Sequence, residues 1–552
     1  MNMIHRFKYP LAQAKTSWQL VLLGAIVGLL ASLAIIALRL GIEAAQTFYM
    51  GSADAFEEQS TLTRFIAPFC GVLLILLIGY LSGHRHFRMG IPFVLHRQRK
   101  HYGFIPIGNT INQFFSAITA IASGFSVGRE GPAVHVGAGS ASYLAQKLYL
   151  PKNTGRILTS CGIAAGISAS FNSPLAAVVF VLEVVVQRYR IHLFLPIMVA
   201  ALIGTAMTRM VFGNVHQYSN LSIPDISTLS VIPFLGLGIL IGLAAVAFNR
   251  SLLGIAKHSS VLSINVRLPL AALIAGTIGW FIPQTMGSDL GALTIALSDS
   301  PEITFLIMVL IGKFIATVCS LGLGIPGGVI GVLYAIGALL GSVIVWLFIP
   351  LFPQLTPYIP MAVLICMVAM MGTSLNAPLA SVVAVLEFSE NATIIFPSLL
   401  VMVPAIILSQ QVFRLKSLFY QQLDQQKLGY KVSPVIYSLQ DTGVTALMRR
   451  KFDVVHHGID TLKQTTSIPL VMRQYHQEKC RYYLAEKSSN SHEVTPHLLP
   501  TLIETATLAE VYRLLSPQRF GHVLILSHSD KEPVGIISWR TLRKHLHRKQ
   551  GA

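Results

Sequence analysis

Apolar runs long enough to cross a bilayer recur from near the N-terminus to about residue 413, and they dominate the pattern of the chain. The clearest runs are Trp18–Leu38, Phe65–Leu81, Val231–Phe248, Ile303–Cys319 and Ala362–Gly372 with its neighbours. Many apolar runs are interrupted by Gly or Pro, and broken helices at membrane depth are typical where backbone groups line a transport site. The pattern predicts an α-helical integral membrane protein with several spans.

Composition supports this prediction, because 53% of the residues are hydrophobic and only 12% are charged, against about 25% in soluble domains. Lys and Arg number 41 against 23 Asp and Glu, a formal net charge of +18. In a membrane protein this excess indicates cytoplasmic loops that follow the positive-inside rule. No basic segment carries a nucleic-acid motif, so we expect no nucleic-acid partner.

The N-terminal segment carries Arg6, Lys8 and Lys15 ahead of the first apolar run, and no small-residue cleavage site follows that run. We therefore expect residues 1–17 to be a cytoplasmic N-terminus and the first span to be retained in the inner (cytoplasmic) membrane. None of the five cysteines forms a CxxC pair, so we expect buried apolar cysteines and neither a metal site nor a cofactor.

A glycine-rich segment, Gly124-Phe-Ser-Val-Gly-Arg-Glu-Gly-Pro132, places Arg129 and Glu130 inside the apolar landscape. Pro132 suits the first turn of a helix, and a helix N-terminus presents free N–H groups that can hold an anion. An ionisable residue at membrane depth is by default a functional-site candidate. The segment predicts an anion site with a carboxylate, Glu130, that competes for it.

The segment Ser170–Glu183 returns 204 positions later as Ser374–Glu387, and the glycines of 124–137 return 200 positions later. Two blocks at nearly one offset predict a duplicated membrane unit, with repeats near 65–215 and 265–413. Transport sites of duplicated transporters form between the repeats. We therefore expect the turns at 124–131 and 324–331 to face each other across one site, although the offset alone does not make the repeats inverted.

A third block, Arg88-Met89-Gly90-Ile91-Pro92, can also begin a helix, and basic residues surround it. These are Arg85, Arg97, Arg99 and Lys100. The charge either raises the local concentration of anions at a cytoplasmic mouth or serves topology alone, and the two interpretations are compatible.

The order of Gly90-Ile-Pro92, Gly128–Pro132, Asn172–Ala176 and Gly324–Gly328 resembles the CLC family of chloride channels and chloride/proton exchangers, over residues 18–424. The resemblance implies a homodimer in the bilayer, with two inverted repeats of short tilted helices and one anion pathway per subunit. It implies that helix starts at 88–92, 128–132 and 328–332 form an anion cage for chloride or another halide, gated by Glu130. The anion-binding positions are then Met89, Gly90, Ile91, Arg129, Gly131, Val329, Ile330, Phe419 and Tyr420.

Several positions depart from the family pattern. The pore serine is replaced by Met89, which has no hydroxyl donor, so the inner site must rely on backbone N–H groups or other side chains. The pore tyrosine falls at Phe419, with Tyr420 one residue later, and both cannot point into the pore. The internal proton-transfer glutamate falls at Val184, which cannot carry a proton.

The remaining departures concern a Glu/Lys pair of the exchangers, which falls at Leu95 and Gln113, and the block 328–332, which lacks the usual Phe and Pro. Together the departures favour gated chloride permeation through a pore controlled by Glu130. The alternatives are a chloride/proton antiporter with an atypical proton path, a fluoride/proton exporter, and a membrane receptor with a regulatory tail. An enzyme with a phosphate loop is disfavoured, because no Gly-Lys-Ser/Thr ending follows the glycines.

Other polar residues in the apolar region have structural interpretations. Glu183 and Glu387 occupy equivalent helix ends, which favours capping. Lys313 is expected to snorkel or to pack between helices. A proton role is open to His135, although a lone histidine on a helix is more often a packed polar residue.

Composition changes at about residue 425, and the tail 425–552 reads as a cytoplasmic α/β domain. The strand–helix–strand–strand order over 500–538 resembles a CBS domain, whereas the first half, around 432–490, is degenerate. The ribose-binding acid of such domains falls at Thr541, which argues against nucleotide binding and for a structural or dimer-supporting role.

Overall fold

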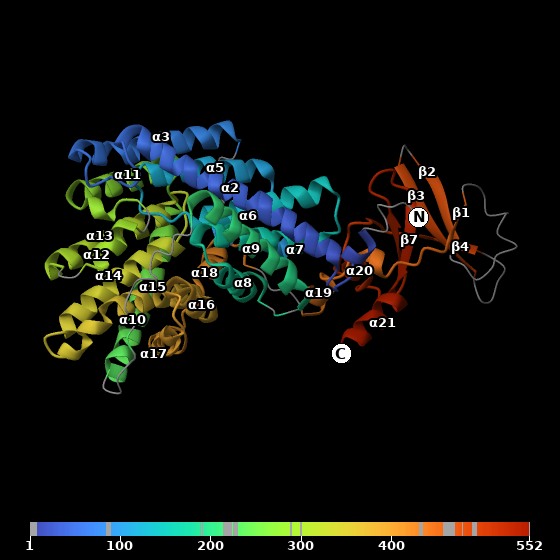
Figure 1. Cartoon of the computed structure of the whole chain (residues 1–552). Helices are drawn as coiled ribbons and strands as arrows, with labels where there is room; N and C mark the ends of the chain where they lie inside the picture. Colours follow the sequence, from blue (N-terminus) through green and yellow to red (C-terminus); the bar gives the residue numbers. More distant parts are fainter. Residues whose placement is uncertain are drawn as a thin grey trace. The chain divides into compact units, whose positions relative to one another are not determined.

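The computed structural model describes residues 8–83, 90–187, 189, 191–213, 224, 230–287, 290–298, 301–429, 434–455, 470–476, 479–487 and 494–550 (Figure 1). Two compact units divide the chain. The larger unit comprises residues 21–144 and 157–429, and the smaller unit comprises residues 1–20, 145–156 and 430–552. The smaller unit thus takes in a segment, 145–156, that the sequence places within the transport domain.

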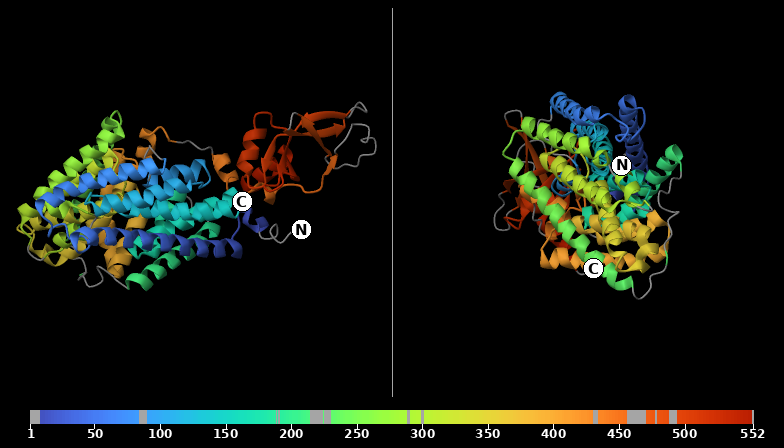
Figure 2. Two further views of the ribbon diagram at one scale, coloured as in Figure 1. Left: turned by 90° about the horizontal axis from the view of Figure 1, so that it is seen from above. Right: turned by 90° about the vertical axis from the view of Figure 1, so that its left-hand side faces the viewer.

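Helices make up the larger unit, as the apolar pattern predicts, and Figures 1 and 2 show the long ones packed side by side. In chain order the α-helices are α2 (Trp18–Met50), α3 (Thr61–Leu81), α4 (Gly90–Lys100), α5 (Ile107–Ala122), α6 (Glu130–Lys147), α7 (Lys152–Phe171), α8 (Pro174–Phe180), α9 (Ile191–Phe212), α10 (Val231–Ser259), α11 (Ile264–Phe281), α12 (Leu290–Ala296), α13 (Ile303–Leu323), α14 (Ile330–Phe348), α15 (Ile359–Leu375), α16 (Pro378–Ser389), α17 (Ile395–Ile407) and α18 (Leu418–Gln425). Two π-helical turns, η1 (Val181–Val186) and η6 (Leu408–Val412), extend α8 and α17.

Nine helical segments of the described residues are long and apolar enough to span a bilayer. They differ in burial: α14 and α15 are covered over most of their length, whereas α3 and α11 expose about two thirds of theirs. Close packing of α14 on α15 depends on Gly337, where an added Cβ would lie 2.5 Å from the carbonyl oxygen of Cys366. The buried pair forms the centre of the unit, and the exposed apolar faces of α3 and α11 suit contact with lipid.

Corresponding segments of the two repeats form corresponding helices. Helices α6, α7, α8 and α9 match α14, α15, α16 and α17 in order, whereas the π-helical turns follow α8 in the first repeat and α17, the counterpart of α9, in the second. The internal repeat in the sequence is therefore also a repeat of local structure.

Two small sheets make up most of the tail in the smaller unit. Strands β5 (Thr501–Ile503), β6 (His522–Leu526) and β7 (Pro533–Ser538) form one sheet, with β5 and β6 parallel and β6 and β7 antiparallel. Helix α20 (Leu508–Leu515) lies between β5 and β6 in sequence, and α21 (Trp539–Gln550) follows β7. The predicted strand–helix–strand–strand order is therefore confirmed.

The other sheet has the order β1 (Asp453–Val455), β2 (Leu470–His476), β3 (Lys479–Lys487) and β4 (Val494–Leu498). Its β1–β2 pair is parallel, and the other pairs are antiparallel. A short helix, α19 (Pro434–Leu439), precedes it. The sheet is formed largely by residues of the region around 432–490, in which the resemblance to a CBS domain is degenerate.

Segment 145–156 is held by the tail within the smaller unit. Lys152 donates through its backbone N–H to the carbonyl of Thr505 at 2.9 Å, and its ammonium pairs with Glu510 at 2.7 Å. Arg156 lies 3.8 Å from a carboxylate oxygen of Asp441. These contacts explain why this loop between α6 and α7 belongs to the same compact unit as the tail.

Candidate anion pathway

The two glycine-rich turns pair directly with each other. Gly128 donates its N–H to the carbonyl of Gly328 at 2.8 Å, and Gly328 donates back to Gly128 at 2.6 Å, as an isolated antiparallel bridge. An added Cβ on Gly131 would lie 2.6 Å from the Cα of Gly328, so the close approach requires glycine. The prediction that the turns face each other is confirmed, and the reciprocal bridge has the local two-fold symmetry expected between inverted repeats.

This bridge brings together the starts of α6 and α14. Glu130 is the first residue of α6, and Val329 caps α14 immediately before its first residue, Ile330. The first N–H groups of a helix have no partner within the helix and carry a partial positive charge. Both positions are buried, so the start of α14 offers donors in an environment with little water.

The Glu130 side chain, which is 0% exposed, occupies this positive end. Its Oε2 accepts a hydrogen bond from the N–H of Gly331 at 3.1 Å. A Cβ added to Gly331 would lie 2.9 Å from Oε1, so the carboxylate lies directly against the backbone of the first turn of α14. A carboxylate held by a helix N-terminus occupies the kind of position that a free anion would take.

The start of α4 lies beside the second glycine turn, because a Cβ added to Gly90 would be 3.9 Å from the carbonyl of Gly327. Gly90 has φ +77°, a backbone conformation that favours glycine. Its N–H donates to Oε1 of Gln113 at 2.9 Å and to Nδ1 of His135 at 3.2 Å. Ile91 follows and is buried. The third helix start therefore lies where the sequence predicted it, whereas Met89 lies outside the described residues.

Helix α18 supplies the two candidate aromatic residues. Phe419 is buried, whereas the hydroxyl of Tyr420 donates to the carbonyl of Val184 at 3.1 Å and lies 2.8 Å from Nη2 of Arg99. The hydroxyl of Tyr420 is thus held at the π-helical turn that contains Val184, the position without a proton-carrying side chain. This contact distinguishes the two aromatic positions, as their offset on a helix predicts.

Glu183 and Glu387 cap helices, as predicted, and each caps a helix of the other repeat. The carboxylate of Glu183 accepts the N–H groups of Leu379 at 3.2 Å and Ala380 at 2.8 Å, at the start of α16. Glu387 accepts those of Leu175 at 2.9 Å and Ala176 at 2.8 Å, at the start of α8. The two carboxylates therefore cross-link the repeats through a symmetric pair of caps.

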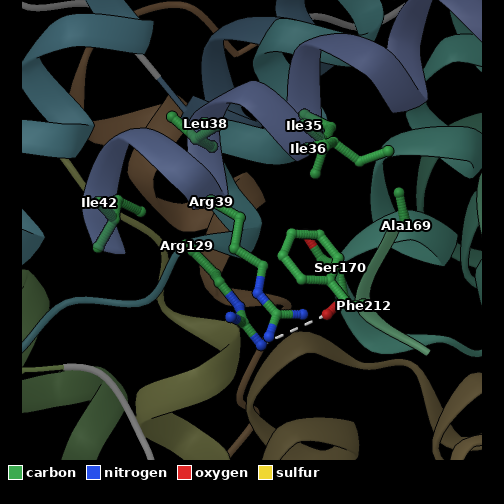
Figure 3. A pocket seen from close by; sticks show the side chains of 9 residues that line it. All are labelled: Ile35, Ile36, Leu38, Arg39, Ile42, Arg129, Ala169, Ser170 and Phe212. Carbon is green, nitrogen blue, oxygen red and sulfur yellow. Dashed lines mark hydrogen bonds between the residues drawn. The ribbon is translucent and has the colours of Figure 1, made fainter. Parts of the chain in front are cut away.

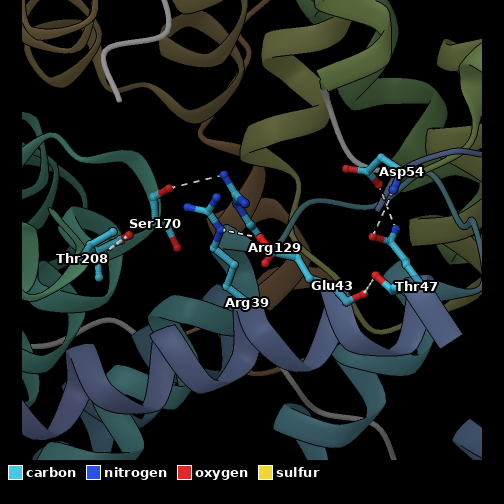
Figure 4. A network of polar contacts seen from close by, with 9 residues as sticks. Arg39, Glu43, Thr47, Asp54, Arg129, Ser170 and Thr208 are labelled. Atoms are coloured by element: carbon cyan, nitrogen blue, oxygen red, sulfur yellow. Dashed lines mark hydrogen bonds and ion pairs between the residues drawn. The ribbon is translucent and has the colours of Figure 1, made fainter. Parts of the chain in front are cut away.

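Arg129 lines a pocket together with Arg39 of α2, and Figure 3 shows the two guanidinium groups close to Ser170 and Phe212. Arg129 donates to the carbonyl of Ser170 at 3.5 Å. Arg39 lies over the ring of Phe212, 3.8 Å from its centroid, and pairs with Glu43 at 2.8 Å (Figure 4). Arg39 was not among the predicted site residues, although a single cation within a long apolar helix is a usable signal.

Lys313 is 1% exposed and does not snorkel. Its ammonium donates to the carbonyl oxygens of Thr285 at 3.2 Å and Gly287 at 3.1 Å. The snorkelling interpretation is wrong, because these buried carbonyls satisfy the ammonium inside the protein, and the packing interpretation holds.

Comparison with known proteins assigns the family. The family model described as "Voltage gated chloride channel" matches residues 70–410, more than half of the chain. The chain therefore belongs to the voltage-gated chloride channel (CLC) family.

Solved structures that share the fold include the following three. A slow cyanobacterial Cl-/H+ antiporter is 20% identical, with a TM-score of 0.67 over 74% of this chain and 98% of its own. A CLC-type fluoride/proton antiporter is 19% identical, with a TM-score of 0.62 over 74% of this chain and 99% of its own. A eukaryotic CLC transporter is 18% identical, with a TM-score of 0.63 over 95% of this chain and 97% of its own. At these identities the likeness establishes the CLC fold of inverted repeats.

Proposed function

We propose that this protein lets chloride cross the cytoplasmic membrane through a pore gated by Glu130, without a fixed exchange of protons. The contact between the Glu130 carboxylate and the Gly331 N–H carries the proposal. A halide and a carboxylate are both anions, so they compete for the same positive helix start.

The gate works by exchange of one anion for another. In the closed state the carboxylate holds the start of α14 through a charge-assisted hydrogen bond. Protonation of Glu130 removes its charge and weakens this bond, and an arriving chloride ion replaces the carboxylate at the same donors. Either event frees the pathway between the paired turns.

Absence of fixed coupling is supported by Val184 and its surroundings. The valine side chain cannot bind a proton, and the neighbouring carboxylate, Glu183, already accepts two backbone N–H groups at the start of α16. A proton therefore lacks the usual carboxylate relay from the cytoplasmic side towards Glu130. An antiporter with a different proton path is the main alternative.

A homodimer in the membrane, with cytoplasmic termini, completes the proposal. Its interface is expected on the apolar helices near 192–213 and 393–413. Large apolar side chains are exposed on both α9 and α17, among them Met210 and Phe396. Faces of this kind suit either a partner subunit or lipid, so the assembly needs its own measurement. The tail is proposed to support the structure without binding nucleotide.

Purified protein in liposomes tests the proposal. Vesicles loaded with chloride or with fluoride are diluted into an impermeant anion, and potassium with valinomycin carries the compensating charge. We expect chloride efflux that exceeds both fluoride efflux and efflux from empty vesicles. Efflux of fluoride alone would assign the protein as a fluoride exporter, and efflux of neither anion would support the receptor alternative.

A further inference from the structure

Two fully buried side chains share one backbone donor at the start of α4. Gln113 of α5 and His135 of α6 are both 0% exposed. Oε1 of Gln113 and Nδ1 of His135 both accept from the N–H of Gly90, at 2.9 Å and 3.2 Å. Three helices therefore contribute to one polar cluster inside an otherwise apolar unit.

The Gly90 N–H determines how both side chains are oriented. Because a donor must face an acceptor, the amide oxygen of Gln113 points to Gly90 and its Nε2 group points elsewhere. An imidazole that accepts at Nδ1 carries its proton on Nε2 when it is neutral. Phe93 stacks on the His135 ring, with centroids 5.2 Å apart and planes 13° apart, which fixes the plane of the ring.

Each side chain thus presents one remaining donor group. Nε2 of Gln113 and Nε2 of His135 are buried and have no hydrogen-bond partner within the described part of the chain. Buried donors are almost always paired, and an unpaired one in a folded protein calls for a specific explanation such as an ordered water or a bound ion. Two such donors around one helix start point to an anionic ligand.

We propose that Gln113 and His135 bind the transported halide at an inner position, through their Nε2 donors. The inference rests on the proposed function and adds the ligands of a second anion position. Met89 offers no hydroxyl here, and the Gly90 N–H is already taken by the two side chains. The two side chains occupy the Gly90 N–H and offer their own Nε2 N–H groups to the anion in its place.

Matched variants test the two ligands. Gln113→Met keeps a side chain of similar length without donors, and His135→Leu removes the imidazole. His135→Gln keeps an acceptor and a donor and serves as the conservative rescue. Asn249→Leu is the control, since Asn249 is equally buried but donates to the carbonyl of Ser374, in a different contact.

Two measurements are made on each variant. Calorimetry measures chloride binding to the detergent-solubilised protein, and flux assays in vesicles measure anion permeability. We expect Gln113→Met and His135→Leu each to weaken chloride binding about tenfold, the loss expected for one good hydrogen bond to a charged group. Both should raise the permeability of thiocyanate relative to chloride, because weakly hydrated anions depend less on donors. His135→Gln should restore most of the binding, and Asn249→Leu should leave the order of anions unchanged.

This inference is overturned if chloride binding and the order of anion permeabilities are both unchanged in the two variants. Chloride flux through the wild-type protein would in that case leave the proposed function intact. If vesicles that contain the wild-type protein showed no chloride flux, the proposed function itself would be overturned. If one variant fails to fold, as judged by gel filtration, the other still decides, since each removes one proposed ligand.

Discussion

Replacing Glu130 by Gln removes the charge of the side chain that occupies the start of α14 and keeps its size. The carboxylate accepts a hydrogen bond from the Gly331 N–H at 3.1 Å. Such a bond to a charged group contributes about 1.5–3 kcal/mol, against about 0.5–1.5 kcal/mol for a neutral pair. The lost difference, about 1–1.5 kcal/mol, shifts the gate towards its open state roughly tenfold.

Chloride efflux from liposomes between about pH 7.5 and about pH 4 measures this shift, because the range extends to the ordinary pKa of a glutamate, about 4.3. Wild-type efflux should rise as the pH falls, because protonation neutralises Glu130 and releases it from α14. Glu130→Gln mimics the protonated gate, so its efflux should be faster at neutral pH and independent of pH. If Glu130→Gln kept the pH dependence of the wild type, protonation of Glu130 would not control chloride efflux.

Glu387→Gln is the matched control for this experiment. It makes the same chemical change at another carboxylate that holds a helix start, where Glu387 accepts from Leu175 and Ala176. We expect this variant to lose stability, by about 1–3 kcal/mol for two weakened hydrogen bonds to a charged group, and to keep the wild-type pH profile of efflux. A flat profile in the control would mean that general loosening of the repeats, not the gate, sets the pH response.

Three further predictions concern the architecture. Gly328→Ala should destabilise the larger unit by about 1–3 kcal/mol or more through overpacking, because its Cβ would lie 2.4 Å from a backbone nitrogen. Gly254→Ala, with nothing within 4 Å, should be neutral or slightly stabilising, and thermal unfolding in detergent compares the two. Lys152→Ala should lower stability by less than about 1 kcal/mol, because the Lys152 side chain in the pair with Glu510 is 42% exposed. A larger loss of stability in thermal unfolding would show that this ion pair contributes more than an exposed pair does. Deleting the tail from residue 425 should leave a dimer by light scattering, and monomers would show that the tail holds the dimer together.

Local sequence patterns predict much of the fold and of the gate. Gly131 and Gly328 stand out in the sequence because their positions tolerate no side chain, and the structure shows the reason in the backbone atoms that an added Cβ would meet. At Gly128 the nearest atom to an added Cβ belongs to the Glu130 carboxylate. Duplication likewise shows that Glu183 and Glu387 are equivalent. It does not show which helix start lies opposite each carboxylate, so the exchange of caps between repeats could not be predicted.

The features of the site that could not be predicted from the sequence are contacts between segments far apart in the chain. The pocket shared by Arg39 and Arg129 joins positions far apart in the chain, and no spacing rule connects them. The cluster at Gly90 draws one residue from each of α4, α5 and α6. Lys313 was expected to snorkel or to pack between helices, and the carbonyls that bind it come from a turn whose position only the fold determines.

Proton movement in vesicles of wild-type protein tests directly whether gated chloride permeation occurs without proton exchange. A steep outward chloride gradient is imposed with no initial pH gradient, and external pH is followed while the membrane potential is clamped by potassium and valinomycin. We expect chloride efflux with no uphill proton movement, and a reversal potential that follows chloride alone. Protons driven against their gradient in a fixed ratio to chloride would contradict this expectation and would make the protein an exchanger with a proton path that bypasses Val184.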